Sequence, residues 1–339
     1  MTRILVIAPS WIGDAVLAQP MFKRLHERHA DLVLDVLAPA WTHALFARMR
    51  EIASTIASPF VHGELALKRR RALGRELAAR RYAQAIVLPN SMKSALVPFF
   101  AGIPLRTGYI GEARWGLLND ARRLDKRALP LMSERFAALA EPRNDELKRP
   151  LAATRLEVSA TQRAATLARL GLAPTRPVAV LCPGAEYGPA KRWPAKYFAE
   201  LALKLADANY AVWLAGSDRD ATIGNEIAQA SEGACVNLCG KTSLAEAIDL
   251  IACAALVVSN DSGLMHVASA LDVPLIALFG SSSPAFTPPA SPRATIVTLD
   301  LPCSPCFRRE CPLGHFNCML QLTPGQVLQR IDFAKLRQP

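Results

Sequence analysis

The chain of 339 residues is long enough for about two domains, each with its own buried core. Hydrophobic residues make up 51% of it, charged residues 20% and aromatic residues 6%, a composition that excludes low-complexity, collagen and coiled-coil proteins. The longest uncharged stretch, Val273–Pro292, contains five prolines and four serines, so it cannot form a membrane-spanning helix. The apolar opening, Ile4–Pro9, is too short for a secretory signal, and we therefore expect a cytoplasmic protein.

The net charge of +11 is unevenly distributed along the chain. Residues 1–150 contain 24 Lys and Arg against 14 Asp and Glu, whereas residues 151–339 contain 16 against 15. We therefore expect the first half to meet an anionic partner, and its densest basic run is residues 68–71. A nucleic acid, a membrane surface and a phosphorylated small substrate all fit, as does a merely solvated helix face. Nucleic acid is disfavoured because no aromatic residues interleave with the basic runs and no helix-turn-helix or zinc-finger spacing is present.

Short apolar runs alternate with helical spacing along almost the whole chain. In the first half they predict strands at residues 3–8, 32–37 and 84–88, and helices at residues 15–29 and 64–81. In the second half they predict strands at residues 177–182, 210–215, 254–258 and 273–278, and helices at residues 159–170, 195–208, 220–231, 244–253 and 264–271. Near-continuous apolar strands separated by helices are typical of parallel sheets covered on both faces.

The alternation lapses in a polar, proline-bounded segment at residues 141–150. We therefore predict two doubly wound α/β domains, residues 1–160 and 161–322, followed by a C-terminal segment, residues 323–339. Thr323 is a suitable N-cap before Pro324 for a final helix, Thr323–Leu336. Ligands of such domains bind at the carboxyl ends of the strands, which predicts a site in a cleft between the two domains.

The first candidate motif, Pro9–Asp14, joins the first strand to the first helix. Neither GxGxxG nor GxxxxGK[ST] is present there, which argues against dinucleotide oxidoreductases and P-loop ATPases. The motif does place a carboxylate, Asp14, beside a helix start. Asp14 is then either a catalytic base or a helix cap.

Two loops of the second half predict a site for an anion. In Pro183–Pro194, Gly184 allows close approach of a ligand to the backbone, and Lys191 places a cation at a helix start, which suits a diphosphate. The same loop is also a plausible helix entry in which Trp193 simply packs. Further candidates follow other strands, where a base, a ribose or an anion could be bound: Ser217, Lys241, Thr242, Asp261, Ser262, Gly263 and His266. For His266 the alternative is a buried core histidine.

Four cysteines cluster near the C-terminus at Cys303, Cys306, Cys311 and Cys318. In a cytoplasmic protein they are expected to be reduced. Only one CxxC pair is present, so we favour a packed thiol cluster over a structural zinc site.

Four segments together resemble glycosyltransferase family 9: RILVIAPSWIGDAVLAQPM, PGAEYGPAKRWP, SNDSGLMHVASAL and CSPCFRRECPLGHFNCM. They occur in the family's order and span essentially the whole chain. The resemblance implies the GT-B fold, in which two Rossmann-like domains face a central cleft, the first binding the acceptor and the second the nucleotide sugar. It also implies that the C-terminal helix of residues 323–339 packs back on the first domain. It implies inverting, metal-independent transfer of L-glycero-D-manno-heptose from ADP-heptose to the first heptose of the lipopolysaccharide inner core, on Kdo-linked lipid A.

The resemblance also implies roles for individual residues. Asp14 corresponds to the general base and Lys191 to the cation that neutralises the donor diphosphate, while the turn from Asp261 to His266 corresponds to the donor site. The family's first-heptose enzymes often have hydroxyl residues where this chain has Glu186 and Tyr187, so phosphate contacts are expected from elsewhere in the loop. We place the acceptor at Trp11, Gly13, Lys68 and Arg69.

Four further expectations and two rival interpretations complete the prediction. We expect no cofactor, no nucleic acid partner, a monomer, and peripheral association with the cytoplasmic face of the inner membrane, where the anionic acceptor lies. One rival is another GT-B nucleotide-sugar enzyme, such as an epimerase or an N-acetylglucosamine transferase. The other is a non-catalytic module that binds a nucleotide sugar or a nucleic acid, for which the basic first half is the support.

Overall fold

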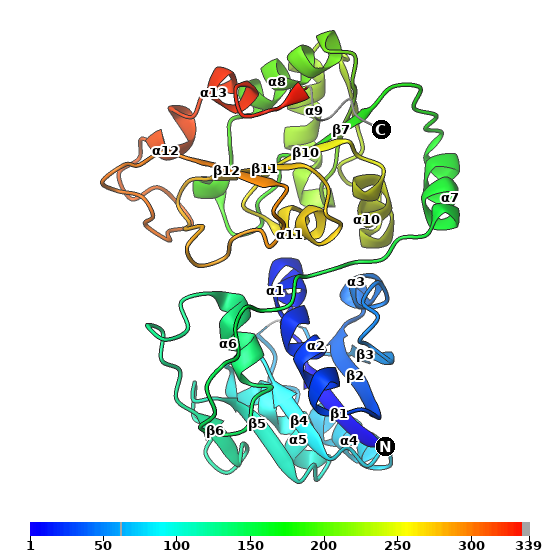
Figure 1. Cartoon of the computed structure of the whole chain (residues 1–339), viewed down its shortest axis with the longest axis vertical. Helices are drawn as coiled ribbons and strands as arrows, with labels where there is room; N and C mark the ends of the chain where they lie inside the picture. The colour runs from blue at the N-terminus through cyan, green and yellow to red at the C-terminus, as the bar shows by residue number, and fades with distance from the viewer. Residues whose placement is uncertain (62, 334–339) are drawn as a thin grey trace. The chain divides into compact units, whose positions relative to one another are not determined.

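The computed structural model describes residues 1–61 and 63–333. The chain divides into two compact units, Met1–Thr154 and Arg155–Pro339, each with its own six-stranded sheet (Figure 1). The division lies slightly before the boundary predicted after residue 160. Residues 155–159 belong to the second unit, where the Leu156 N–H donates to the Ala270 carbonyl at 2.9 Å. No helix in the described part of the chain is long and apolar enough to cross a bilayer.

The first unit contains an entirely parallel sheet in the order β3-β2-β1-β4-β5-β6. The strands are β1 (Thr2–Ile7), β2 (Leu32–Pro39), β3 (Ser54–Ser58), β4 (Gln84–Val87), β5 (Leu105–Tyr109) and β6 (Asp120–Arg122). The α-helices are α1 (Ile12–Leu17), α2 (Gln19–Arg28), α3 (His43–Phe46), α4 (Leu67–Ala78), α5 (Leu96–Phe100) and α6 (Met132–Ala138). The order of the strands reverses between β1 and β4, which makes this pair the topological switch point.

Helices cover both faces of this sheet. Leu5 and Ile7 of β1 pack in one core cluster with Leu77 of α4 and Val97 of α5. The alternate residues of β1 point to the other face, where α2 packs against α6 and α1. The single helix predicted at residues 15–29 is divided into α1 and α2 around Ala18, because Pro20 has no N–H for the Val16 carbonyl.

A buried ionic cluster lies within the first sheet. Asp35 of β2, only 1% exposed, accepts hydrogen bonds from Tyr82 at 2.6 Å, Ser54 at 2.7 Å, Arg3 at 3.1 Å and Arg80 at 3.2 Å. Burial alone raises the pKa of Asp35, but the hydrogen bonds from Tyr82, Ser54 and Arg3 outweigh it and lower the pKa below the ordinary value. The carboxylate is fully used inside the fold.

The second unit repeats the architecture, with parallel strands in the order β12-β11-β10-β7-β8-β9. They are β7 (Val178–Cys182), β8 (Ala211–Leu214), β9 (Cys235–Asn237), β10 (Leu256–Asn260), β11 (Leu275–Phe279) and β12 (Ala294–Thr298). The α-helices are α7 (Ala160–Leu170), α8 (Ala195–Asp207), α9 (Ala221–Ala230), α10 (Leu244–Ala252), α11 (Gly263–Ala270), α12 (Asn317–Leu320) and α13 (Pro324–Leu328). Here the strand order reverses between β7 and β10.

The C-terminal helix is shorter than predicted. Thr323 is its N-cap, as expected, and accepts from the Gln326 N–H, but the continuous helix ends at Leu328 instead of reaching Leu336. The last turn tightens, because the Ile331 N–H donates to the Leu328 carbonyl instead of continuing the α-helical ladder. α13 packs against α8, and Val327 and Ile331 join the core of the second unit. Residues 334–339 lie outside the described residues, and packing of this segment on the first domain stays a prediction.

Candidate active site

The carboxyl ends of β7 and β10 bring two predicted loops together in the second unit. The loop after β7 is residues 183–194, called here the donor loop, and the turn after β10 contains Asp261 and Ser262. Asn260, fully buried at the end of β10, connects them. Its side-chain amide donates to the Pro183 carbonyl at 2.7 Å, and its side-chain oxygen accepts from the Trp193 N–H at 3.1 Å. The loops therefore meet at the switch point, where doubly wound domains bind ligands.

Lys191 and Asp261 form the central ion pair of this site. Lys191 Nζ lies 2.5 Å from Asp261 Oδ2, and the two side chains are only 17% and 5% exposed. Ser282, which follows β11, donates its hydroxyl hydrogen bond to the same carboxylate oxygen. The ammonium is thus fixed in a half-buried position, where it interacts strongly with an incoming anion.

His266 lies in the first turns of α11 and is 4% exposed. Burial lowers the pKa of His266 to about 4, with a further lowering by Lys191 and an opposing effect of Asp261. The imidazole is therefore neutral near pH 7. The interpretation of His266 as a buried core histidine is correct about its burial. A contact between His266 and the donor stays a prediction. Ser262 is the N-cap of α11 and Gly263 its first residue.

The loop after β8 is tightly packed around Asp220. The Asp220 carboxylate accepts from the N–H and the hydroxyl of Ser217 at 2.9 and 2.7 Å. It also lies directly against Gly184, where a Cβ would come within 2.5 Å of the carboxyl group. Gly184 is therefore required for the packing of two neighbouring loops. The hydroxyl of Ser217 is committed to Asp220 in this structure.

Lys241 and Thr242 lie in the loop between β9 and α10. The Lys241 side chain is exposed, and its carbonyl accepts from Arg169 at 3.0 Å. The Thr242 hydroxyl is buried without a hydrogen-bond partner among the described residues. An unsatisfied buried hydroxyl is costly, which makes Thr242 the stronger candidate of the two for a ligand contact.

Glu186 and Tyr187 occupy the tip of the donor loop. Glu186 forms an exposed ion pair with Arg219. The Tyr187 hydroxyl donates to the Phe307 carbonyl at 2.8 Å, and Lys191 Nζ lies 5.1 Å from the centre of its ring. Trp193 is fully buried, and its indole N–H donates to the Leu322 carbonyl at 2.6 Å. Both interpretations of this loop are therefore compatible with the structure: Trp193 packs at the helix entry, and Lys191 places a cation beside it.

In the first unit, Asp14 lies at the corresponding switch point between β1 and β4. It is the third residue of α1, half-buried, and the N-cap position is taken by Trp11. Trp11 is 46% exposed. Asp14 is therefore not the N-cap of its helix, although its negative charge still favours the helix start.

The predicted acceptor residues do not gather in one place. Trp11 and Gly13 lie beside Asp14 at the start of α1, in the layer formed with α2 and α6. Lys68 and Arg69 are exposed residues of α4, in the α4–α5 layer on the opposite face of the sheet. Arg69 forms an ion pair with Glu64 and donates to the Pro59 carbonyl at 3.0 Å.

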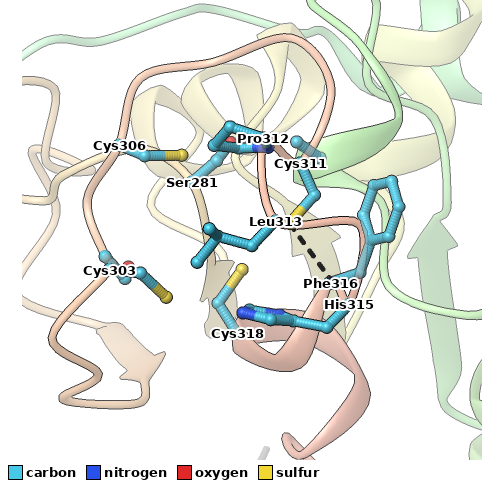
Figure 2. A pocket seen from close by; sticks show the side chains of 11 residues that line it. Ser281, Cys303, Cys306, Cys311, Pro312, Leu313, His315, Phe316 and Cys318 are labelled. Atoms are coloured by element: carbon cyan, nitrogen blue, oxygen red, sulfur yellow. Dashed lines mark hydrogen bonds between the residues drawn. The ribbon is translucent and has the colours of Figure 1, made fainter.

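The four clustered cysteines line one small pocket with His315 and Ser281 (Figure 2). Their thiols are free. Burial and the neighbouring cysteines raise the pKa of Cys318, whereas backbone N–H groups, first that of Phe316 at 3.4 Å, lower the pKa of Cys311. Within residues 1–61 and 63–333, no three His, Cys, Asp or Glu side chains are arranged to hold a metal ion.

Several residues of the site were missed by sequence reasoning. Asn260 and Ser282 hold the Lys191–Asp261 pair and its loops in place, and Asp220 orders Ser217. Asn260 and Ser282 lie within four residues of the end of a predicted strand, and Asp220 starts a predicted helix, so a systematic reading of polar residues near strand ends could have found them.

Comparison with known proteins agrees with this architecture. The model of the family described as "Glycosyltransferase family 9 (heptosyltransferase)" matches residues 70–317. Lipopolysaccharide heptosyltransferase 2 of Escherichia coli (strain K12) is 46% identical over 345 residues, covering 99% of each chain. The protein of the same name from Salmonella typhimurium (strain LT2) is 46% identical, covering 97% of each.

A solved structure, "Structure of E. coli ADP-heptose lps heptosyltransferase II", superimposes with a TM-score of 0.90 at 44% identity, covering 99% of this chain and 98% of that one. The two parallel-sheet units and this match define the fold as GT-B, which confirms the predicted fold class. The chain belongs to glycosyltransferase family 9, the heptosyltransferases, and is a glycosyltransferase.

Proposed function

We propose that this enzyme transfers L-glycero-D-manno-heptose from ADP-heptose to the first heptose of the lipopolysaccharide inner core on Kdo-linked lipid A. Relatives at 46% identity carry the name lipopolysaccharide heptosyltransferase 2, and the solved relative at 44% identity is titled as an ADP-heptose enzyme. The observation that carries the proposal is the half-buried Lys191, held by Asp261 at the switch point of the second sheet. That position suits the diphosphate of a nucleotide sugar.

In this proposal the second unit binds the donor. The diphosphate lies against Lys191 and the backbone N–H groups at the start of α11, with Gly184, Ser217, Lys241, Thr242, Asp261, Ser262, Gly263 and His266 lining the nucleotide and sugar. As the bond from the anomeric carbon to the phosphate oxygen breaks, negative charge grows on the leaving ADP. A fixed ammonium stabilises that developing charge without reorganisation. His266, being neutral, adds no competing charge.

In this proposal the first unit binds the acceptor and supplies Asp14 as the general base. A sugar hydroxyl is a poor nucleophile, so an inverting displacement needs a base that takes its proton as the new glycosidic bond forms. Asp14 stands at the carboxyl edge of the first sheet, beside Trp11 and Gly13. Lys68 and Arg69 meet the anionic parts of the acceptor from α4. Their separation from Asp14 across the sheet fits an acceptor that extends well beyond the reacting heptose.

The environment of the enzyme follows from the acceptor. Lipid A and its core sugars are anionic and lie at the inner leaflet of the cytoplasmic membrane. A first unit with a charge of +10 suits docking on that surface without spanning it. The proposal includes a monomer, no nucleic acid partner and no metal in the transfer.

One assay tests the proposal directly. The purified chain is incubated with ADP-heptose and a core acceptor that ends in the first heptose, and released ADP is measured. Acceptor-dependent ADP release, with addition of one heptose seen by mass spectrometry, supports the proposal. Binding of ADP-heptose without release would favour a non-catalytic module, and release only with another nucleotide sugar would favour another GT-B enzyme.

A further inference from the structure

The donor loop is fastened to a segment that the proposed mechanism does not use. This segment, residues 303–318, contains the four clustered cysteines and is called here the cysteine segment. The Ala190 N–H donates to the Arg309 carbonyl at 3.0 Å, and the Tyr187 hydroxyl donates to the Phe307 carbonyl at 2.8 Å. At Gly188, whose φ is +156°, a Cβ would lie 2.5 Å from the Arg309 carbonyl oxygen. The two backbones therefore touch, and Arg309 has a fixed position beside the loop.

This contact brings two cations to one aromatic ring. Lys191 Nζ lies 5.1 Å and the Arg309 guanidinium carbon 5.3 Å from the centre of the Tyr187 ring. Each distance is within the range of a cation–π contact, which holds a cation in place without neutralising it. Tyr187 thus positions a second positive charge next to the lysine at the proposed diphosphate site.

The two cations differ in their counter-charges. Lys191 is paired with Asp261, whereas no carboxylate in the described part of the chain forms an ion pair with Arg309. Two like charges near one ring repel each other, and an anion bound close to both would offset that repulsion. A guanidinium also presents a planar fork of donors that matches the oxygens of a phosphate.

We propose that Arg309 is a second diphosphate-binding residue of the donor site, held in place by the ring of Tyr187. The inference rests on the proposed function, since it assigns the donor diphosphate to the loop of Lys191. It also gives the cysteine segment a role: the segment carries a phosphate contact to the donor loop.

The test compares two neighbouring arginines. Arg309→Ala is expected to raise the Kd for ADP, measured by calorimetry, and the KM for ADP-heptose by about tenfold, as expected for one charge-assisted contact. Arg308→Ala removes the same charge one residue away, where no contact with the donor loop is found among the described residues, and should leave both within about twofold. Arg309→Lys keeps the charge without the fork and should be intermediate.

Further measurements test the role of Arg309 separately from the proposed function. Arg309→Gln, which keeps the aliphatic stem, and the melting temperatures of all variants show whether a loss reflects folding. If Arg309→Ala and Arg309→Gln bind ADP as tightly as the wild-type chain, while Lys191→Ala binds it more weakly, Arg309 is not a diphosphate-binding residue. That result would leave the proposed function standing. Failure of the wild-type chain to bind ADP would overturn both.

Discussion

The two units share one architecture but place their buried charge differently. In the first unit, Asp35 lies in the middle of β2 and is saturated by two arginines, a tyrosine and a serine. In the second unit, Asp261 lies just after β10, beside the start of a helix, with a lysine as its cationic partner. The Asp35 cluster stabilises the sheet itself, whereas the Lys191–Asp261 pair places a cation at the carboxyl end of a sheet. Position along the strand, more than burial, distinguishes a stabilising carboxylate from one that serves a site.

The units also differ in what holds their carboxyl edges. In the second unit, Asn260 and Ser282 fasten the loops after β7, β10 and β11 to one another, and Asp220 orders the loop after β8. In the first, Asp14 stands in a short helix whose N-cap residue, Trp11, makes no side-chain capping hydrogen bond. We therefore expect the donor side to be largely preformed. The experiments below ask whether the two edges have the separate chemical roles that this contrast predicts.

Asp14→Asn is expected to have the largest effect. Asparagine keeps the shape of the side chain but cannot accept the proton, so turnover should fall by about 10²–10⁴-fold. Because Asp14 belongs to the first unit, the affinity for ADP and the melting temperature should hardly change. Acceptor-dependent ADP release, calorimetry with ADP and thermal unfolding are the three measurements.

Asp31→Asn supplies the matched control, since Asp31 is an exposed carboxylate of the same unit. It should behave like the wild-type chain. If Asp14→Asn retains near-normal turnover, the base lies elsewhere. If it unfolds the protein, Asp14 has a structural role at the start of α1, and the assignment of the base is contradicted.

Lys191→Ala tests the donor edge of the second unit. Its removal takes away a preorganised cation, and we expect a loss of about 10²-fold in turnover, with weaker ADP binding. This combination distinguishes it from Asp14→Asn, which should spare ADP binding. Lys196→Ala, an exposed lysine in the following helix, is the control. Unchanged kinetics in Lys191→Ala would contradict the assignment of the diphosphate to this loop.

The sequence predicted the centre of each sheet better than its edges. Near-continuous apolar runs mark β1, β2, β4, β7, β8, β10 and β11, and all seven strands are confirmed. Edge strands β3, β6, β9 and β12, and β5 beside an edge, were not predicted. β12, for example, has a single buried residue, Val297, whereas its other large apolar residue, Ile296, is exposed. A half-exposed strand beside a loop lacks the pattern that sequence reasoning uses.

In the candidate site, too, the sequence predicted some residues and not others. Lys191 and Asp261 were predicted individually, because each follows an apolar strand, and the structure places them 2.5 Å apart. Their support by Asn260 and Ser282 depends on which strands are neighbours, and the order of the strands is not written in local periodicity. Arg309 could not be placed at all, since the cysteine segment has neither helical nor strand spacing.

The pH dependence of stability should also differ between the units. His266 has a pKa of about 4 in the folded chain and an ordinary value of 6.5 when unfolded, so only the unfolded chain takes up its proton between those values. Its contribution is complete above pH 6.5 and is lost as the pH falls toward 4, on the order of 3 kcal/mol in all. His266→Gln should lack this part of the slope in chemical unfolding between pH 7 and 4.

Asp35→Asn provides the contrasting measurement from the first unit. The pKa of Asp35 is lowered in the folded chain, so its contribution is present above the ordinary carboxyl pKa and is lost only as the pH falls below about 3.8. This variant should therefore be destabilised at neutral pH yet keep the wild-type slope between pH 6.5 and 4. Equal slopes in His266→Gln and the wild-type chain would mean that His266 is not the group responsible.

The smallest effect is expected from metal chelators, and it concerns the second unit alone, because all eight cysteines lie there. Cys303, Cys306, Cys311 and Cys318 line one pocket, but no three of them are arranged around a common ligand position in the described residues. We expect packed, reduced thiols, with turnover unchanged by EDTA or a stronger zinc chelator. Metal analysis of the purified chain checks the premise. Tightly bound metal in stoichiometric amount, with loss of ADP binding on its removal, would show that the cysteine segment needs an ion to hold Arg309 beside the donor loop.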